Sequence, residues 1–334
     1  MRFKIYSIVM MFQIFGLISH AQGILTNESH NIQILNPSYY GFNNQTTAGV
    51  IYNSINYDGI QNIDTKYGFT GVSFSDLNFA IGLDVVSHQV EEFGLLENQI
   101  NLSYIYKMSL NYNTYFLPSL YIGFLNRSIK SENLVFEDQL NLLTGFIASS
   151  SIDPAANLDQ SATGFDVGAS GIIYNENYLL GLTIKHINQA NISLNQEVEE
   201  PRDMSISLQA AYEFDLNKYN RSALPRNTYL FFYVSANKQG ELMRFYANQE
   251  LQLNSFVIGI NQKVTSLEAF NFTNIGFNTG IAVGNIDFNV GYSFPVTSEN
   301  ILPPKVLEFS LLFNFDPYLS RNRGNYKRLK TDNF

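Results

Sequence analysis

Hydrophobic and polar residues alternate along most of the chain. From Ile286 to Phe294 every second residue is apolar and the residues between are small or polar, and similar patterns run over 204–214 and 307–315. A period of two over nine to eleven residues predicts β-strands with one apolar and one polar face. Strands of soluble sheets usually have about five or six residues, whereas a tilted strand that crosses a bilayer needs about 9–11. The pattern therefore predicts transmembrane strands.

Fourteen segments of this kind follow one another along the chain. An even number of strands is typical of closed bacterial barrels. The sequence therefore predicts an all-β fold, a transmembrane antiparallel β-barrel of about fourteen strands over residues 46–315. The predicted strands lie near 46–54, 65–74, 79–86, 99–109, 115–124, 165–174, 178–187, 204–214, 228–236, 242–251, 256–264, 274–283, 286–294 and 307–315.

The connections between these strands alternate in length. Those after even-numbered strands are mostly short, as at 284–285, and those after odd-numbered strands are mostly long, as at 125–164. Transmembrane barrels have short periplasmic turns and longer outer loops. Both ends of the barrel are therefore predicted to lie in the periplasm.

The predicted barrel is too wide to be filled by its own wall. Eight strands suffice for an interior packed with side chains, whereas 16–18 strands leave a channel. The lumen of a fourteen-stranded barrel must then hold water, a plug or a partner. Two segments could fill it: residues 22–45, before the first strand, and the long connection 125–164, whose residues 140–150 are apolar enough to fold inward.

The first 21 residues resemble a secretory signal peptide. Arg2 and Lys4 precede an apolar run from Ile5 to Ile18, and small residues stand at −3 and −1 of a cleavage site between Ala21 and Gln22. No later segment is long and apolar enough to predict a transmembrane helix. An exported chain with no cysteine cannot be a domain stabilised by disulfides.

Composition and charge narrow the class of protein further. Only 15% of the residues are charged, against about 25% in an average soluble domain, and the formal net charge of −9 becomes −11 without Arg2 and Lys4. A chain this acidic is not expected to bind nucleic acid. The tail 316–334 differs, because five basic and two acidic residues give it a net charge of +3. Its basic residues are candidates for docking to a periplasmic partner, the alternative being a passive solvated tail: Arg321, Arg323, Lys327, Arg328 and Lys330.

The sequence offers little for catalysis. His186 continues the outward register of the strand 178–187 and is predicted to lie at the membrane interface, and His88 is predicted in a loop beside Glu91 and Glu92. No phosphate-binding loop, nucleophile motif or metal-spaced histidine pair is present. We therefore predict that the protein is not an enzyme and uses no metal or other cofactor.

Several short motifs carry a family resemblance. The run Asn36-Pro37-Ser38-Tyr39-Tyr40-Gly41 resembles the NPAYAG motif of the PorP/SprF family, with Ser38 and Tyr40 in place of two alanines. Asp153-Pro154-Ala155-Ala156-Asn157 is similar to a segment that precedes the family's central hairpin, and 168–187 resembles that hairpin, with Tyr174, Tyr178, Gly181 and His186 at the motif positions. The resemblance suggests that Asn36, Pro37, Tyr39, Gly41, Asp153, Pro154 and Asn157 belong to a plug or family motif.

The resemblance implies a non-enzymatic outer-membrane component of the type IX secretion system of Bacteroidota. Such a protein would support secretion or surface anchoring of a partner adhesin, including adhesins of gliding motility. Its other partners would be the periplasmic motor ring or a peptidoglycan-binding lipoprotein, together with outer-membrane lipids.

Two alternative functions remain open at this stage. A FadL-like transporter of hydrophobic compounds would need an apolar pocket in the lumen, and a general porin would need an open one. The inward registers are polar, as at Gln209 and Asn289, which favours a wet or protein-filled interior.

Overall fold

The structure is a computed structural model that describes residues 27–44, 46–57, 61–91, 94–129, 139, 160–194, 199–218, 223–225, 227–266, 270–296, 304–315 and 329. A short helix, α2 (Ile32–Leu35), and a 3-10 helix, η1 (Pro37–Asn44), precede the strands, and a second 3-10 helix, η2 (Ser75–Leu77), follows the second strand. The strands are β1 (Thr47–Tyr57), β2 (Gln61–Phe74), β3 (Phe79–Val90), β4 (Leu95–Tyr106), β5 (Met108–Asn111), β6 (Thr114–Ile129), β7 (Gln160–Tyr174), β8 (Tyr178–Lys185), β9 (Ser205–Asp215), β10 (Thr228–Gln239), β11 (Leu242–Leu253), β12 (Phe256–Ser266), β13 (Phe270–Val283), β14 (Ile286–Pro295) and β15 (Lys305–Asn314).

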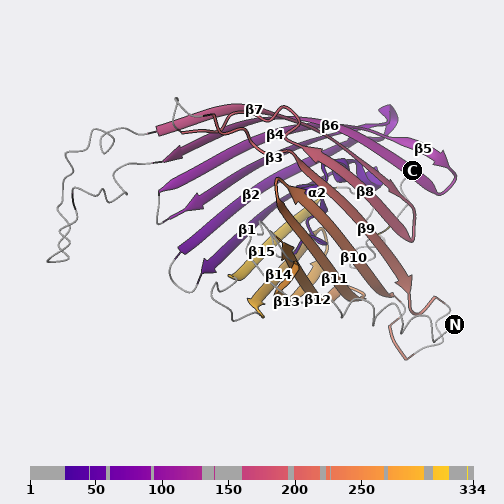
Figure 1. The fold of residues 1–334 in the computed structure, drawn as a ribbon. Helices are drawn as coiled ribbons and strands as arrows, with labels where there is room; N and C mark the ends of the chain where they lie inside the picture. Colours follow the sequence, from indigo (N-terminus) through magenta and orange to yellow (C-terminus); the bar gives the residue numbers. More distant parts are fainter. Residues whose placement is uncertain are drawn as a thin grey trace.

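The strands close into a single antiparallel ring. Except for β4 and β5, each strand pairs with its neighbours along the chain; β1 pairs with β15, and β4 pairs with β6. β5 continues β4 after Lys107, whose backbone N–H donates to the carbonyl of Asn78, one residue beyond the β3–β4 pairing. The wall is therefore a fourteen-stranded barrel with one interrupted position, and the predicted fold is confirmed (Figure 1).

Many strands agree with their predicted positions at one end of the barrel and exceed them at the other, although β8 ends two residues short of its predicted limit. At the end with the short turns, β2 ends at Phe74 and β6 begins at Thr114, each within a residue of its expected limit. At the opposite end β2 begins at Gln61, β6 reaches Ile129 and β7 begins at Gln160, four or five residues beyond expectation. Above the apolar band both faces of a strand are wet, so the period-two signal disappears although the hydrogen-bonded ladder continues.

The two faces of the wall have opposite character. On β6, Leu120 and Ile122 are 65% and 60% exposed, whereas Ser119 and Tyr121, which alternate with them, point inward and are buried. Large apolar side chains are exposed in the same alternation on the other strands of the ring, as expected for a lipid-facing band. None of the helices that the structure describes has the length and apolar character needed to cross a membrane.

The topology makes a direct prediction for labelling of intact cells. The connections 254–255 and 284–285 are short and lie at the end assigned to the periplasm, and the connection between β8 and β9 lies at the opposite end. An epitope inserted after Ser193, in that connection, should bind antibody on intact cells, whereas an epitope fused after Phe334 should bind only after permeabilisation. The reverse labelling pattern would contradict the assigned orientation of the barrel in the membrane.

Candidate functional site: the lumen and its N-terminal segment

Residues 27–44, called here the N-terminal segment, lie inside the barrel. α2 is seen within the ring of strands in Figure 1, and η1 packs against β2, β3, β4, β6 and β7. The segment also bonds to inward side chains of β9, β11 and β15, on other sides of the ring. Eighteen residues therefore reach most of the inner wall.

Two buried carboxylates hold the beginning of the segment. One oxygen of Glu250 accepts hydrogen bonds from the Ser29 hydroxyl at 2.7 Å and from the Asn278 amide at 3.0 Å, and it lies 2.8 Å from Nε2 of His30. The side chains of His30 and Glu250 are 1% and 0% exposed. A carboxylate buried this deeply is stable only with several donors around it, so the segment and the wall depend on each other.

Glu308 on β15 also accepts hydrogen bonds from the segment. Its two oxygens accept from the Asn27 backbone N–H at 3.3 Å, the Asn31 amide at 3.2 Å and the Asn53 amide at 3.1 Å. Asn27 and Asn31 come from the segment, and Asn53 comes from β1. The first turn of the segment is thus fixed between β11 and β15.

Asn36 joins the segment to the opposite wall. Its side-chain nitrogen donates to Oε1 of Gln209 at 2.9 Å and to the carbonyl of Gly171 at 3.3 Å, and its side-chain oxygen accepts from the Ser38 N–H at 3.1 Å. A Cβ at Gly181 would lie 2.8 Å from the same nitrogen, so glycine leaves room for the amide. Pro37, with its fixed φ, then starts η1.

The aromatic residues after Pro37 are held by side chains of the wall. The Tyr40 hydroxyl lies 2.8 Å from the Tyr67 hydroxyl and donates to Asp84 at 3.4 Å. Its ring lies so close to Gly82 that a Cβ there would overlap it. Tyr39 stacks on Phe42, with ring centroids 4.7 Å apart.

Glycine is needed at position 41 because a side chain would not fit there, and not because of the backbone conformation. The described residues with positive φ do not include it, and a Cβ at this position would lie 2.8 Å from Cγ2 of Ile105. The motif residues Asn36, Pro37, Tyr39 and Gly41 therefore all lie inside the barrel against its wall.

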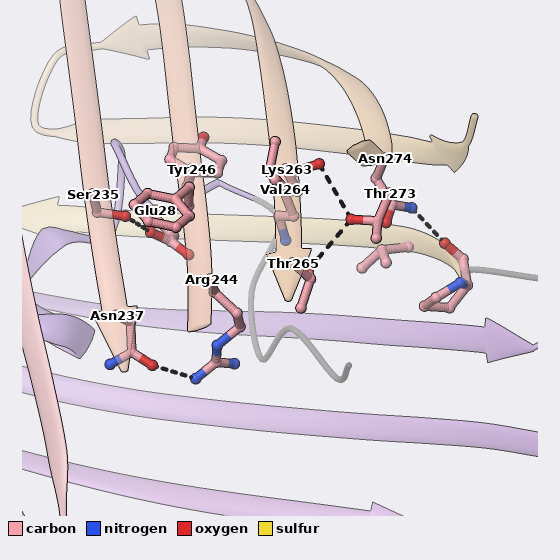
Figure 2. Close-up of a pocket in the computed structure, with 13 residues that line it drawn as sticks. Glu28, Ser235, Asn237, Arg244, Tyr246, Lys263, Val264, Thr265, Thr273 and Asn274 are labelled. Carbon is pink, nitrogen blue, oxygen red and sulfur yellow. Dashed lines mark hydrogen bonds between the residues drawn. The ribbon is translucent and has the colours of Figure 1, made fainter. Parts of the chain in front are cut away.

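A small pocket of about 20 Å³ lies beside the start of the segment, towards the outer ends of β10–β13 (Figure 2). Glu28 bonds to the Ser235 hydroxyl, and Nη2 of Arg244 donates to Oδ1 of Asn237 at 2.8 Å. Lys263 also lines the pocket. Burial raises the pKa of Glu28, an effect that the charges of Lys263 and Arg244 oppose. The pocket thus combines three charged side chains with apolar ones such as Phe245 and Val306.

The histidines are not where the alternation places them, and the prediction of an interfacial His186 is wrong. β8 ends at Lys185, and His186 has a φ of 59°, which turns its ring into the barrel. Its Nδ1 lies 2.8 Å from Asp166 on β7, and burial lowers its pKa. His88 lies on β3 rather than in a loop, with Nδ1 2.8 Å from the hydroxyl of Thr65.

The connection after β8 is tied back across the lumen. Arg202, just before β9, donates to Gln99 and Glu97 of β4, in each case at 3.3 Å. Gln99 in turn donates to Asp166 at 2.9 Å. Inward side chains of β4 and β7 thus share one polar network with the β8–β9 connection. The sequence did not predict this network, because its residues meet only when the ring closes.

Some predicted site residues lie outside the described residues. These are Asp153, Pro154 and Asn157, the apolar stretch 140–150, and the basic residues Arg321, Arg323, Lys327, Arg328 and Lys330. Leu329 of the tail is described: it is 1% exposed, and its N–H donates to Glu213 at 3.4 Å. Within the described ranges, no three His, Asp or Glu side chains come together as a metal site requires.

The tilted strands, apolar outer band and polar interior define a bacterial outer-membrane β-barrel. The particular family follows from the sequence: the chain belongs to the family of type IX secretion system membrane proteins PorP/SprF, whose model matches residues 25–311. It is therefore an outer-membrane barrel of the type IX secretion system, and its family is one of secretion proteins rather than of enzymes.

Several solved barrels have a similar fold at low identity. A FadL homologue from Pseudomonas aeruginosa is 10% identical, covers 84% of this chain and 93% of its own, and has a TM-score of 0.48. A deletion mutant of the monoaromatic hydrocarbon channel TodX is 12% identical, with coverages of 86% and 94% and a TM-score of 0.49. Omp33 from Acinetobacter baumannii is 9% identical, with coverages of 82% and 100% and a TM-score of 0.44. No curated protein matches the sequence.

Proposed function

We propose that this barrel supports the secretion or surface anchoring of a partner adhesin, in the manner needed for gliding motility. The observation that carries the proposal is the N-terminal segment, which bonds to β9, β11 and β15 and occupies the lumen. A lumen that holds its own chain leaves the two ends of the barrel for contacts with proteins, and the family of secretion membrane proteins to which the chain belongs favours that use over the passage of solutes.

Charged side chains gather towards the outer end of the lumen. Glu28, Arg244 and Lys263 line a pocket among the outer parts of β10–β13. The polar side chains that face the lumen, such as Asn248 and Gln252, argue against a FadL-like carrier, which would hold hydrophobic compounds in an apolar pocket.

The periplasmic end offers the basic tail. Leu329 packs among apolar lumenal side chains and its N–H bonds to Glu213, close to the end of β9 that faces the periplasm. A tail anchored there would hold its five basic side chains near the periplasmic mouth. An acidic surface of the motor ring or of a peptidoglycan-binding lipoprotein is the partner that this charge fits.

The proposal predicts the result of a purification from the native envelope. The tagged full-length protein, extracted in mild detergent, should bring down one secreted adhesin and a periplasmic component of the secretion machine, both identified by mass spectrometry. A matched preparation of an unrelated outer-membrane barrel should bring down neither. Recovery of the barrel without any type IX protein would contradict the proposed function.

A further inference from the structure

A groove opens on the lipid-facing wall of β1, β2 and β3 and continues to β14 and β15. Gly68 of β2 faces outward, and no atom would lie within 4 Å of a Cβ added there. The groove has a volume of about 480 Å³, and outward apolar side chains such as Val50, Val85 and Leu311 line it. All the residues that line it belong to paired strands.

Gly68 interrupts an apolar row of the membrane band. The register places Gly68 between Val50 and Val85, and the row continues through Ile100 to Phe124. These four flanking side chains are all exposed on the outer face. The groove therefore forms because Gly68 has no side chain, and it lies within the apolar band and not at the edge of that band.

From β2 to β6 the next row towards the outer side is polar, whereas towards β15 the same row meets the apolar Phe309. There Lys66 stands between Tyr52 and Ser87, and the row continues through Asn98 to Asn126. The change from an apolar to a polar row marks the outer boundary of the membrane band. Because the short turns face the periplasm, this boundary lies at the level of the outer-leaflet head groups.

Lys66 is an exposed positive charge at the rim of the groove. It makes no hydrogen bond or ion pair with another residue that the structure describes. Asp64, two residues nearer the outer end, is the other outward charge on β2. An unpaired ammonium above an apolar slot matches an amphiphile with an anionic head group.

We propose that this groove binds one outer-leaflet glycolipid whose head group carries phosphate, with an acyl chain in the space at Gly68 and the phosphate at Lys66. Lipid tails are as apolar as the wall, so burying a chain here gains packing but no hydrophobic driving force. Selectivity then comes from the shape of the slot and from one charge pair, which near an anionic surface changes occupancy about fivefold. The inference rests on the outer-membrane location and is independent of the proposed partners.

Native mass spectrometry of the full-length barrel tests the charge. The probes are monophosphorylated lipid A and the same lipid after removal of its phosphate, titrated in an uncharged detergent. The wild type should retain one phosphorylated lipid about fivefold better than the dephosphorylated one. Lys66→Gln should abolish that preference without changing binding of the dephosphorylated lipid. Lys238→Gln, at the outer end of β10 and away from the groove, should keep the preference.

Filling the groove tests the shape. Gly68→Leu should lower retention of both lipids, whereas Ala236→Leu, on the outward register of β10, should lower neither. Both variants should keep the gel migration of a folded barrel, because a Cβ at Gly68 meets open space. Equal retention of the two lipids by the wild type, or a preference that survives Lys66→Gln, would overturn the charge site. Undiminished retention by a folded Gly68→Leu protein would overturn the groove.

Discussion

Removal of residues 22–35 should convert a closed barrel into an open pore. The deletion takes away Asn27, Ser29, His30 and Asn31, which hold the segment to β11 and β15, and keeps Asn36 to Asn44 with the packing around Tyr40. An interior this wide is not filled by its own wall, so we expect the conductance in planar bilayers to rise at least about tenfold. Liposome swelling with small sugars should rise in parallel.

A milder variant separates release of the segment from its loss. Glu250→Gln with Glu308→Gln removes two buried charges that accept hydrogen bonds from the segment, each charged bond contributing about 1.5–3 kcal/mol. We expect intermittent openings. Glu241→Gln, in the exposed turn between β10 and β11, serves as the matched control and should stay closed. Unchanged conductance in the deletion would mean that another part of the chain closes the lumen.

Neutralising the tail should remove adhesin from the cell surface while the barrel itself still assembles. Replacing Arg321, Arg323, Lys327, Arg328 and Lys330 by glutamine changes the net charge of residues 316–334 from +3 to −2. If each basic residue contributes about 1 kcal/mol towards an acidic surface, surface adhesin should fall by at least about tenfold. Immunoblots of surface-shaved cells measure it.

The five glutamine substitutions leave Leu329 in place, whereas truncation of the tail would also remove the buried side chain of Leu329. Leu329→Ala alone provides the comparison: it removes apolar contacts with the lumenal cluster but no charge. We expect that variant to reduce the heat stability of the barrel more than adhesin display. Normal display after neutralisation would show that the tail is a passive extension.

The strand pattern was predictable because lipid and lumen impose opposite demands on alternate residues. Leu120 and Ser119 illustrate it: one must face lipid and the other must not, so their order fixes the register. Where the contrast between the lipid-facing and lumenal sides is weak, the predicted strands were too short or a side chain was assigned to the wrong face. His186 fits the outward register by spacing alone, but a backbone with φ of 59° and the Asp166 carboxylate turn it inward.

The lumenal contacts were only partly predictable. The sequence singled out Asn36, Pro37, Tyr39 and Gly41 as a motif, and their position before the first strand suggested the lumen. Glu250 and Glu308 were missed, although both occupy inward registers, Glu250 between Asn248 and Gln252. Which inward residues meet the segment depends on closure of the whole ring, and no local pattern carries that information.

The most direct test of the account is the surface proteome of a strain that lacks this chain. We predict that one adhesin disappears from the surface and accumulates inside the envelope, that other outer-membrane barrels keep their abundance, and that the wild-type chain supplied in trans restores the adhesin. An unchanged surface proteome, combined with impaired uptake of a hydrophobic compound, would contradict a role in type IX secretion and favour a transport function for the barrel.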